Sequence, residues 1–365
     1  MFARTDGLWA SEYPFRLATE MMKNWHQNLV SCFAILLAIG ISDAFGDPRS
    51  INGLVNSNSL NQAQQGQIED YAKFYCNNLS SGDIDLVENA KRQLLGPLRA
   101  PSISPHFRLK YGKLLVPHLK PVIDGDSPYA AVNALQVVGF LGTNDALNLI
   151  KDHINIDDEE SFAKRLWAVK AFVVAYKQQN LSANQLNPML RQLGMACKTE
   201  TQSMILHSQF SAISIVNSTI AREVLLDAVS TKLEDIAGKD NPSELMGAIY
   251  PALVSLRDQY LILPQNQQRT FGVSIAPSLC KVFKVSLAHW DKIQLDAEAK
   301  RQFTSNYKGA NEVAEAFLRT IAREIGSKEP PQTQIADAWT DNDKPRFEAQ
   351  HKIWHDIVNQ PPYGR

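Results

Sequence analysis

Apolar side chains recur at helical spacing along most of the chain. Ile68, Tyr71, Ala72 and Tyr75 lie at positions i, i+3, i+4 and i+7, which places them on one face of a helix. Alternating Val, Ile and Thr patterns bounded by hairpin turns do not occur. The pattern predicts an all-α protein, with helices near 67–79, 84–95, 105–123, 128–141, 144–153, 159–178, 183–194, 201–216, 219–237, 242–262, 271–288, 294–306 and 309–326.

Several of these helices are expected to begin at a capping residue followed by proline. The capping side chain accepts a hydrogen bond from an unpaired N–H, and proline has no N–H to satisfy at the first helical position. Such pairs are Ser104-Pro105, Ser127-Pro128 and Asn241-Pro242, and weaker caps are Thr143, Ser182 and Ser218. Prolines inside the expected helices should kink, split or shorten them, at Pro117, Pro121, Pro188, Pro251 and Pro277.

Short connections between paired helices indicate a repeat. Residues 127–138 align with 161–172 at a spacing of about 34 residues, the length of a helix-pair repeat. Ala134 then pairs with Ala168, and Val138 with Phe172. A poorer third copy begins near Glu200.

Residues 103–237 resemble HEAT- or armadillo-type α-helical repeats, which form α-solenoids. The clearest unit is SPYAAVNALQVVGFLGTNDALNLIKDHI, with a small-residue helix, a turn at Leu141-Gly142, Asp145 and a Leu-rich second helix. The Asp and Arg landmarks of a strong HEAT unit do not recur in the later copies. The resemblance implies an irregular HEAT-like array with an extended surface for a protein partner. Helical repeats also build enzymes, so the fold leaves the function open.

The N-terminal region has the pattern of an export signal. An uncharged apolar run, Leu29–Ser42, follows Lys23 and precedes small residues that suit cleavage after Gly46. As a helix this run is about 21 Å long, short of the ~30 Å hydrocarbon core of a bilayer. An uncleaved anchor and a buried core helix remain alternatives. Because residues 1–20 are polar, we expect translation to begin at Met21 or Met22.

The expected organisation has four parts. Residues 1–46 are the signal region, 47–66 a flexible polar lead-in, 67–326 the helical repeat-like domain, and 327–365 a linker with a C-terminal helix. The tail either docks on the domain or stays mobile. Two indoles, Trp339 and Trp354, favour docking, since exposed indoles are uncommon.

Composition narrows the class of protein. The 365 residues include 37 Lys+Arg and 38 Asp+Glu, a net charge of -1, and 44% are hydrophobic. These values exclude strong disorder and, with a single long apolar run, a multi-span membrane protein. This near-equal number of positive and negative side chains argues against nucleic acid as a partner. Apart from Cys32 in the expected signal, the cysteines are Cys76, Cys197 and Cys280. No two of them have CxxC spacing, and each is expected to be a buried apolar residue.

Two clusters are candidates for metal or acid–base chemistry. His351 and His355 lie four residues apart on an expected helix, but HKIWH lacks the Glu of HExxH and a third ligand, so a solvated face is the default. The carboxylates 157–160 precede a helix, where negative charge favours the helix start, and a catalytic or cation-binding role is the alternative. The segment 124–126 is expected to be a turn, not a calcium loop.

The most basic stretch is also expected to be a solvated helix face, with contact to an anionic partner as the alternative. It runs from 106 to 120 and contains His106, Arg108, Lys110, Tyr111, Lys113, His118 and Lys120.

No nucleotide-binding, hydrolase or kinase motif occurs, and no residue is assigned a catalytic, cofactor-binding or metal-binding role. The sequence favours an exported non-enzymatic scaffold, periplasmic or secreted, that binds a protein partner and has no membrane span after signal cleavage. The alternatives are an α-helical hydrolase of an extracytoplasmic polymer and an intracellular adaptor. A cleft with convergent carboxylates or histidines would favour the hydrolase, and an extended apolar or charged surface without them would favour the scaffold.

Overall fold

The computed structural model describes residues 50–178, 181–325 and 329–363. The chain divides into the units Met1–Ser50 and Ile51–Arg365, and all the helices of the described residues belong to the second unit. The expected signal, its cleavage position and the expected start at Met21 or Met22 lie outside the described residues.

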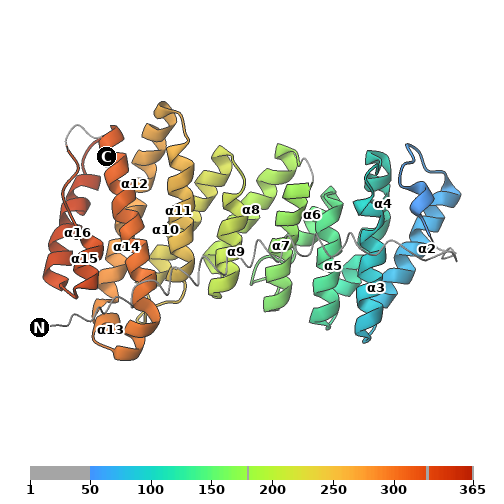
Figure 1. The fold of residues 1–365 in the computed structure, drawn as a ribbon, viewed down its shortest axis with the longest axis horizontal. Coiled ribbons are helices and arrows are strands. Elements are labelled where there is room, and N and C mark those ends of the chain that lie inside the picture. The colour runs from blue at the N-terminus through green and yellow to red at the C-terminus, as the bar shows by residue number, and fades with distance from the viewer. Residues whose placement is uncertain (1–49, 179–180, 326–328, 364–365) are drawn as a thin grey trace, which may run out of the picture. The chain divides into compact units, whose positions relative to one another are not determined.

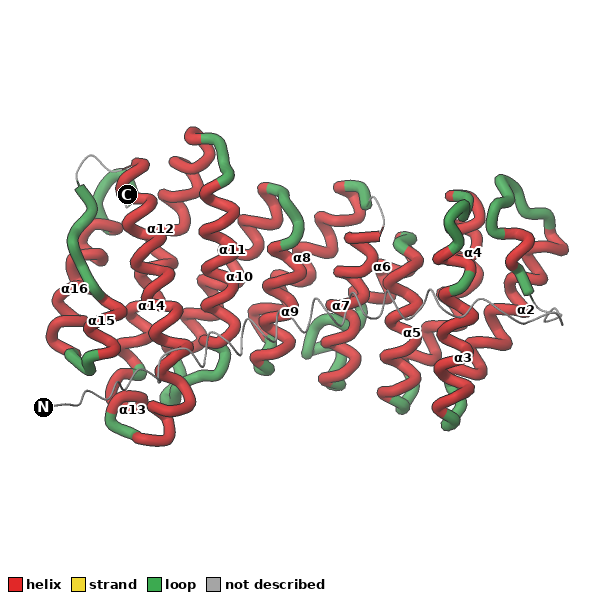
Figure 2. The backbone as a smooth tube through the Cα atoms, in the orientation of Figure 1, coloured by secondary structure: helices red, strands yellow, loops and turns green. Residues whose placement is uncertain are grey.

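Every regular element in the described residues is a helix, and no strand occurs there, which confirms the all-α prediction (Figure 2). In chain order the elements are η2 (Asn52–Leu54), α2 (Gln62–Leu79), α3 (Ile84–Leu95), η3 (Pro97–Arg99), α4 (Pro105–Asp124), α5 (Pro128–Leu141), α6 (Asn144–Lys151), α7 (Phe162–Gln178), α8 (Ala183–Thr199), α9 (Ser203–Ser214), α10 (Thr219–Ala237), α11 (Met246–Leu261), α12 (Gln265–Ala288), α13 (Trp290–Gln294), α14 (Ala297–Ile325), α15 (Ile335–Thr340) and α16 (Lys344–Val358).

From α2 to α10, each helix packs mainly on helices one and two places away in the chain, whereas α11 also packs on α14, and α12 on α16. One series contacts in the order α3, α5, α7, α9, α11 and α14, and a second in the order α2, α4, α6, α8, α10, α12 and α16. Consecutive helices, such as α4 and α5 or α8 and α9, join the two series. Figure 1 shows these helices side by side in chain order. A continuous set of buried apolar residues extends from Ile51 to Val358, so the helices bury their apolar stripes against local neighbours.

The predicted caps lie at four helix starts. The hydroxyls of Ser104, Ser127, Thr143 and Ser218 accept hydrogen bonds from the third residue of α4, α5, α6 and α10. At Ser182, Gln185 Oε1 accepts from the backbone N–H and from the hydroxyl, both at 3.0 Å.

The predicted cap at Asn241-Pro242 is wrong. Helix α11 begins at Met246, and the Asn241 Oδ1 accepts a hydrogen bond from Lys292 Nζ at 3.3 Å. The side chain is therefore used for a contact between distant segments instead of a helix start.

The internal prolines neither split nor shorten their helices, which corrects those two parts of the prediction. Helix α4 runs through Pro117 and Pro121, and α8, α11 and α12 run through Pro188, Pro251 and Pro277. Buried apolar residues follow each proline in its helix, so packing outweighs the hydrogen bond that proline removes.

The two helices predicted at 294–306 and 309–326 are one helix, α14. Gly309 lies inside it, and a Cβ there would come within 3.2 Å of the Tyr250 ring. The glycine therefore permits close approach of α11 and α14 and does not end the helix.

The expected flexible lead-in over 47–66 is partly ordered. Ile51, Val55 and Leu60 are buried, and α2 begins at Gln62 instead of near 67. A capping box explains the earlier start: Gln64 N–H donates to Asn61 Oδ1, and Asn61 N–H donates to Gln64 Oε1, both at 2.9 Å.

The C-terminal tail docks through its two indoles. Trp339 and Trp354 are almost fully buried. The Trp339 ring packs edge-on to Trp290 and stacks on Tyr307, with ring centroids 4.8 and 5.6 Å apart. Helices α15 and α16 thereby pack on α14 and α12.

Among the described helices, α12 alone is long and apolar enough to match a membrane span by length and composition. More than half of its apolar window is buried, and the helix contacts α10, α14 and α16. Packing within the protein therefore accounts for its apolar character.

Candidate functional site

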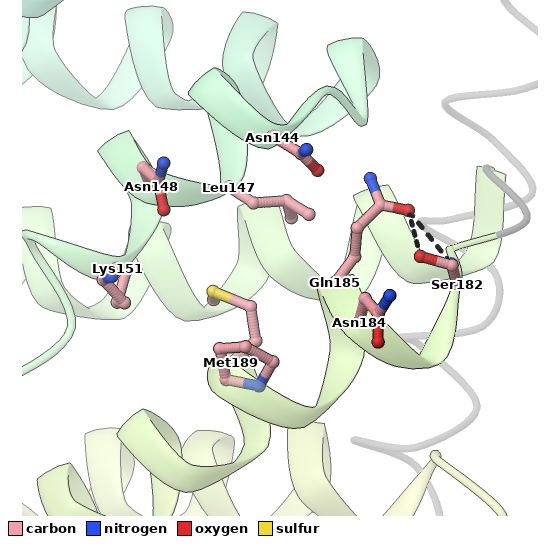
Figure 3. Close-up of a pocket in the computed structure, with 9 residues that line it drawn as sticks. Asn144, Leu147, Asn148, Lys151, Ser182, Asn184, Gln185 and Met189 are labelled. Atoms are coloured by element: carbon pink, nitrogen blue, oxygen red, sulfur yellow. Dashed lines mark hydrogen bonds between the residues drawn. The ribbon is translucent and has the colours of Figure 1, made fainter.

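A groove of about 520 Å³ lies between α6 and α8 (Figure 3). Leu147 and Met189 are buried in its wall, whereas Asn144, Asn148 and Asn184 are exposed. The complete lining is Asn144, Leu147, Asn148, Lys151, Ser182, Asn184, Gln185, Pro188 and Met189.

The groove follows from the short length of α6. This helix has 8 residues, whereas its neighbours α4 and α8 have 20 and 17. Gly142, at φ 64°, ends α5 in the left-handed conformation that glycine adopts without strain, and Thr143 then caps α6. A short helix beside a longer one leaves part of the α8 surface uncovered.

Amide chemistry dominates this groove. Asn144, Asn148 and Asn184 each offer two N–H donors and one acceptor oxygen, and Lys151 adds a positive charge. The Gln185 oxygen is engaged by Ser182, so its amide nitrogen is the group left for a ligand (Figure 3). No carboxylate or histidine is among the lining residues. The groove is suited to hydrogen-bond a polar chain, such as a peptide backbone, and lacks a side-chain general base.

A second groove, of about 450 Å³, lies beside α14 and α15 and contains Glu312, Glu315 and Asp337. The buried Glu315 is fully engaged: Oε1 accepts from Thr333 Oγ1 at 2.5 Å and Arg319 Nη2 at 2.9 Å, and Oε2 accepts from Ile335 N–H at 2.9 Å. This carboxylate therefore holds the tail in place.

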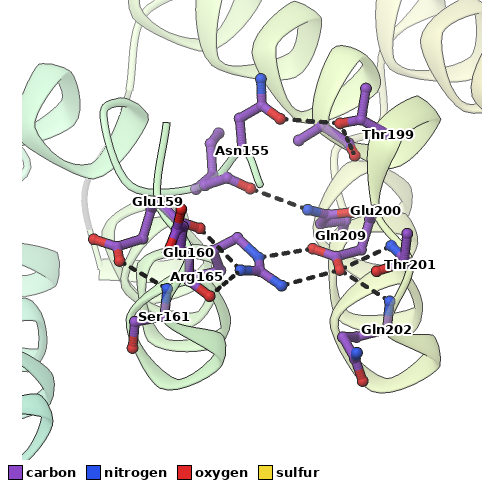
Figure 4. Close-up of polar contacts among 12 residues, drawn as sticks. Asn155, Glu159, Glu160, Ser161, Arg165, Thr199, Glu200, Thr201, Gln202 and Gln209 are labelled. Atoms are coloured by element: carbon purple, nitrogen blue, oxygen red, sulfur yellow. Dashed lines mark hydrogen bonds and ion pairs between the residues drawn. The ribbon is translucent and has the colours of Figure 1, made fainter. Parts of the chain in front are cut away.

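The most buried charges form a network that joins successive helix pairs (Figure 4). Arg165, in α7, makes two hydrogen bonds to Glu200, just before α9: Nε to Oε2 at 2.9 Å and Nη2 to Oε1 at 3.2 Å. Arg165 Nη1 also donates to the carbonyl oxygens of Glu159 and Glu160. Each nitrogen of the guanidinium therefore has a partner within the protein.

Lys232 of α10 extends this network. Its Nζ donates to the carbonyl oxygens of Lys198 and Glu200 at 2.8 and 3.0 Å. Burial lowers the pKa of Lys232, while the carboxylate of Asp235 opposes that shift. Gln209 adds a hydrogen bond to the carbonyl oxygen of Ile154 at 3.1 Å. Each of these side chains fixes the backbone of a neighbouring helix pair, which is a structural role.

The acidic run at 157–160 serves the start of α7. Glu159 Oε1 accepts a hydrogen bond from Ser161 N–H at 2.9 Å, directly before the helix. Its other oxygen lies 2.9 Å from His153 Nδ1 and 3.7 Å from Lys164 Nζ. Asp157, Asp158 and Glu160 are exposed.

The histidine pair on α16 does not gather further ligands. The ring centroids of His351 and His355 are 5.9 Å apart. Within the described ranges, no group of three or more His, Cys, Asp or Glu side chains is placed to hold a metal ion. Burial, followed by repulsion from His355 and Lys284, lowers the pKa of His351.

The basic stretch at 106–120 is divided between surface and core. Arg108 Nη1 donates to the carbonyl oxygen of Phe140 at 2.8 Å, Tyr111 is buried, and Lys120 pairs with Asp124 at 3.1 Å. Lys113 and Lys120 are exposed, and His106, Lys110 and His118 are partly exposed.

The three cysteines in the described part of the chain are buried, as expected from the sequence, and they are free thiols. Burial raises the pKa of Cys76 and of Cys280 to about 12, and raises that of Cys197 further. Thiols of this kind are poor nucleophiles and serve as core residues.

No protein-family model matches the sequence, and no curated protein matches it. The groove between α6 and α8 was not predicted from the sequence, although its four amide side chains are at positions 144, 148, 184 and 185. Their signal is helix spacing: Asn144 and Asn148 lie one turn apart on one face of a short helix.

Proposed function

We propose that the protein is an exported, non-enzymatic interaction scaffold built as an irregular HEAT-like α-solenoid. The contact pattern carries the proposal: from α2 to α10, each helix packs on neighbours one and two places along the chain, as stacked helix pairs do. Such stacking leaves the outer surfaces of both series for a partner.

The buried charges support the solenoid assignment. Arg165 reaches Glu200 across 35 residues, and Lys232 reaches the carbonyl oxygen of Lys198 across 34. These separations match the repeat length of about 34 residues expected for a helix pair. Both contacts end at residues 198–200 and join the end of α8 to α7 on one side and to α10 on the other.

The groove between α6 and α8 is the proposed partner site. Its amides pair with the backbone of an extended polypeptide, and Leu147 and Met189 supply apolar contact. The hydrolase alternative has less support, because the groove has no carboxylate and Glu315 in the second groove is fully engaged.

Affinity purification from the exported fraction tests this site. An Asn184→Lys variant, which places a long cation in the groove, should lose the partner that the wild type retains. Asn77→Lys, at an exposed amide of α2, is the matched control and should retain it. Equal recovery by all three proteins, or turnover of a polymer by the purified chain, would contradict the proposal.

Export is proposed from the apolar run Leu29–Ser42 and the small residues that end at Gly46. N-terminal sequencing of the native protein from fractionated cells tests it. If the exported protein begins near Asp47, export is supported. If the chain is found soluble in the cytoplasm with Leu29–Ser42 retained, the protein is an intracellular adaptor.

A further inference from the structure

Exposed apolar side chains recur at the first turn of four successive helices in one series. They are Ile84 and Leu86 of α3, Tyr129 of α5, Phe162 of α7 and Met204 of α9, with exposed fractions of 64, 44, 42, 41 and 61%. Five of the eleven large apolar residues exposed in the described part of the chain thus lie within the first three residues of these helices. Single exposed apolar residues are ordinary, but a group of them at the starts of neighbouring helices is a candidate interaction surface. We call these five residues the first-turn row.

Contacts between the helices place the row on one end of the series. Tyr129 Oη donates to Glu88 Oε1 at 2.8 Å, which joins the starts of α5 and α3. Arg165, in the first turns of α7, bonds Glu200 directly before α9. On the same end, His153 Nε2 lies 3.4 Å from Asp124 Oδ1, which joins the loops that precede α7 and α5.

This end of the series is strongly acidic. Exposed carboxylates there, in loops and at helix ends, are Asp83, Asp85, Glu88, Asp124, Asp126, Asp157, Asp158 and Glu160. Lys91 and Lys120 neutralise Glu88 and Asp124, but among the described residues no ion pair forms at Asp126, Asp157, Asp158 or Glu160. At the opposite end of the same helices, the loops 142–143 and 215–218 contain no charged residue, and the loop 96–104 contains Arg99 and no carboxylate.

Helix capping explains only part of this pattern. Asp83 caps α3, and Glu159 serves α7, as negative charge at a helix start should. Capping gives no reason for Phe162 to be exposed two residues after Glu160. An apolar row flanked by negative charge is complementary to a segment that is apolar on one face and cationic on its flanks.

We propose that the first-turn row binds a cationic amphipathic helix of a protein partner. Packed helices lie about 8–10 Å apart, and seven residues of a helix rise about 10 Å, so an apolar residue at every second turn meets each helix of the row. Lysine or arginine between these positions then faces the acidic loops. The inference deepens the proposed scaffold role and rests on it, but the first-turn row and the groove share no residue, so the two are tested independently.

A peptide of about 21 residues with a leucine face and lysine flanks is the probe, since it spans the row at 1.5 Å per residue. Fluorescence anisotropy with the full chain should show binding that weakens as NaCl rises from about 50 to about 500 mM. A peptide with the same leucines and glutamate in place of lysine should not bind. Equal binding of both peptides, or no binding of either, would overturn the proposal.

Variants locate the binding. Phe162→Ser with Met204→Ser should weaken binding of the lysine peptide by about tenfold or more, because central apolar contacts are lost. Leu261→Ser with Ile262→Ser, which removes two exposed apolar residues elsewhere, is the matched control and should bind as the wild type does. Asp157→Asn with Asp158→Asn should weaken binding at low salt only. If Phe162→Ser with Met204→Ser leaves binding unchanged, the peptide binds another surface. If sedimentation shows a dimer that these two substitutions abolish, the occupant is a second copy of the chain. Either result overturns the proposal.

Discussion

Arg165 and Glu200 form a buried ion pair that links two successive helix pairs. The side chains are 3% and 0% exposed, and two hydrogen bonds of 2.9 and 3.2 Å join them. The Glu200 carboxylate also accepts from the backbone N–H groups of Thr201 and Gln202, at 3.0 and 2.9 Å. The pair therefore fixes the N-terminal end of α9 relative to α7.

Removing one partner of this pair should be strongly destabilising. Arg165→Met leaves the Glu200 carboxylate buried without its counter-charge, which costs about 3–5 kcal/mol of unfolding free energy. The double variant Arg165→Met with Glu200→Gln should recover much of that loss. Urea unfolding followed by circular dichroism measures both changes.

The matched control is Lys198→Met, at a surface pair with Asp227. Surface pairs contribute about 0–1 kcal/mol, so this variant should unfold close to the wild type. If Arg165→Met lowers the free energy of unfolding no more than Lys198→Met does, the buried pair does not hold the helix pairs together.

Gly139 permits the close approach of α5 and α7. A Cβ there would lie 2.9 Å from the carbonyl oxygen and 3.0 Å from the Cα of Ala171, and both are backbone atoms that do not move aside. Gly139→Ala should cost about 1–3 kcal/mol of unfolding free energy. Gly66→Ala, with open space around it in α2, should instead stabilise by about 0.5–1 kcal/mol. Thermal unfolding of the two variants should shift in opposite directions, and a loss at both sites would refute the steric explanation.

Glu315 is expected to hold the C-terminal tail. In Glu315→Gln one oxygen becomes an NH₂ group, so the side chain cannot accept from both Thr333 and Ile335 as the carboxylate does. Amide hydrogen exchange in α15 and α16 should accelerate, while exchange in α4 and α5 stays unchanged. Glu312→Gln, at an exposed position of the same helix, should leave the tail protected. Equal protection in both variants would mean that the indole contacts alone hold the tail.

His289 should make stability depend on pH. It is buried, with Nδ1 2.8 Å from Tyr307 Oη and Nε2 3.0 Å from the carbonyl oxygen of Lys239. Burial lowers its pKa below the ordinary value of about 6.5. As pH falls below about 6.5, the unfolded chain takes up a proton that the folded chain does not, so the unfolding free energy decreases until the lower folded pKa is reached. Well above pH ~6.5 the residue is neutral in both states and its contribution is constant.

The slope of unfolding free energy between about pH 7 and about pH 5 measures this effect. His289→Gln should flatten part of the slope, and His351, whose pKa is also lowered, should account for some of the remainder. An unaltered slope in His289→Gln would contradict the assignment.

Local chemistry made much of the fold predictable. Ser104, Ser127, Thr143 and Ser218 cap helices because a hydroxyl before a helical pattern satisfies a free N–H wherever the chain then goes. The predicted cap at Asn241 and the predicted break between 306 and 309 were wrong for the opposite reason. Asn241 contacts Lys292, and Gly309 packs against Tyr250, both far away in the sequence, and such contacts override local preference.

The candidate site was less predictable than the fold. The four amides of the groove are ordinary surface residues in the sequence, and only the short length of α6 beside α8 brings them together. Arg165 and Glu200 are likewise ordinary charged residues until tertiary packing places them in contact. The acidic residues 157–160 were assigned to a helix start from sequence, and Glu159 serves one, because negative charge there acts locally.

Contact at the groove is the central claim, and site-specific photocrosslinking tests it most directly. A photoreactive residue at position 148, inside the groove, should give a discrete adduct with one protein of the exported fraction. The same residue at position 77, on α2, should not. Asn184→Lys in the chain with the probe at position 148 should abolish the adduct. Adducts of equal yield from both positions, or none from position 148, would contradict the scaffold account.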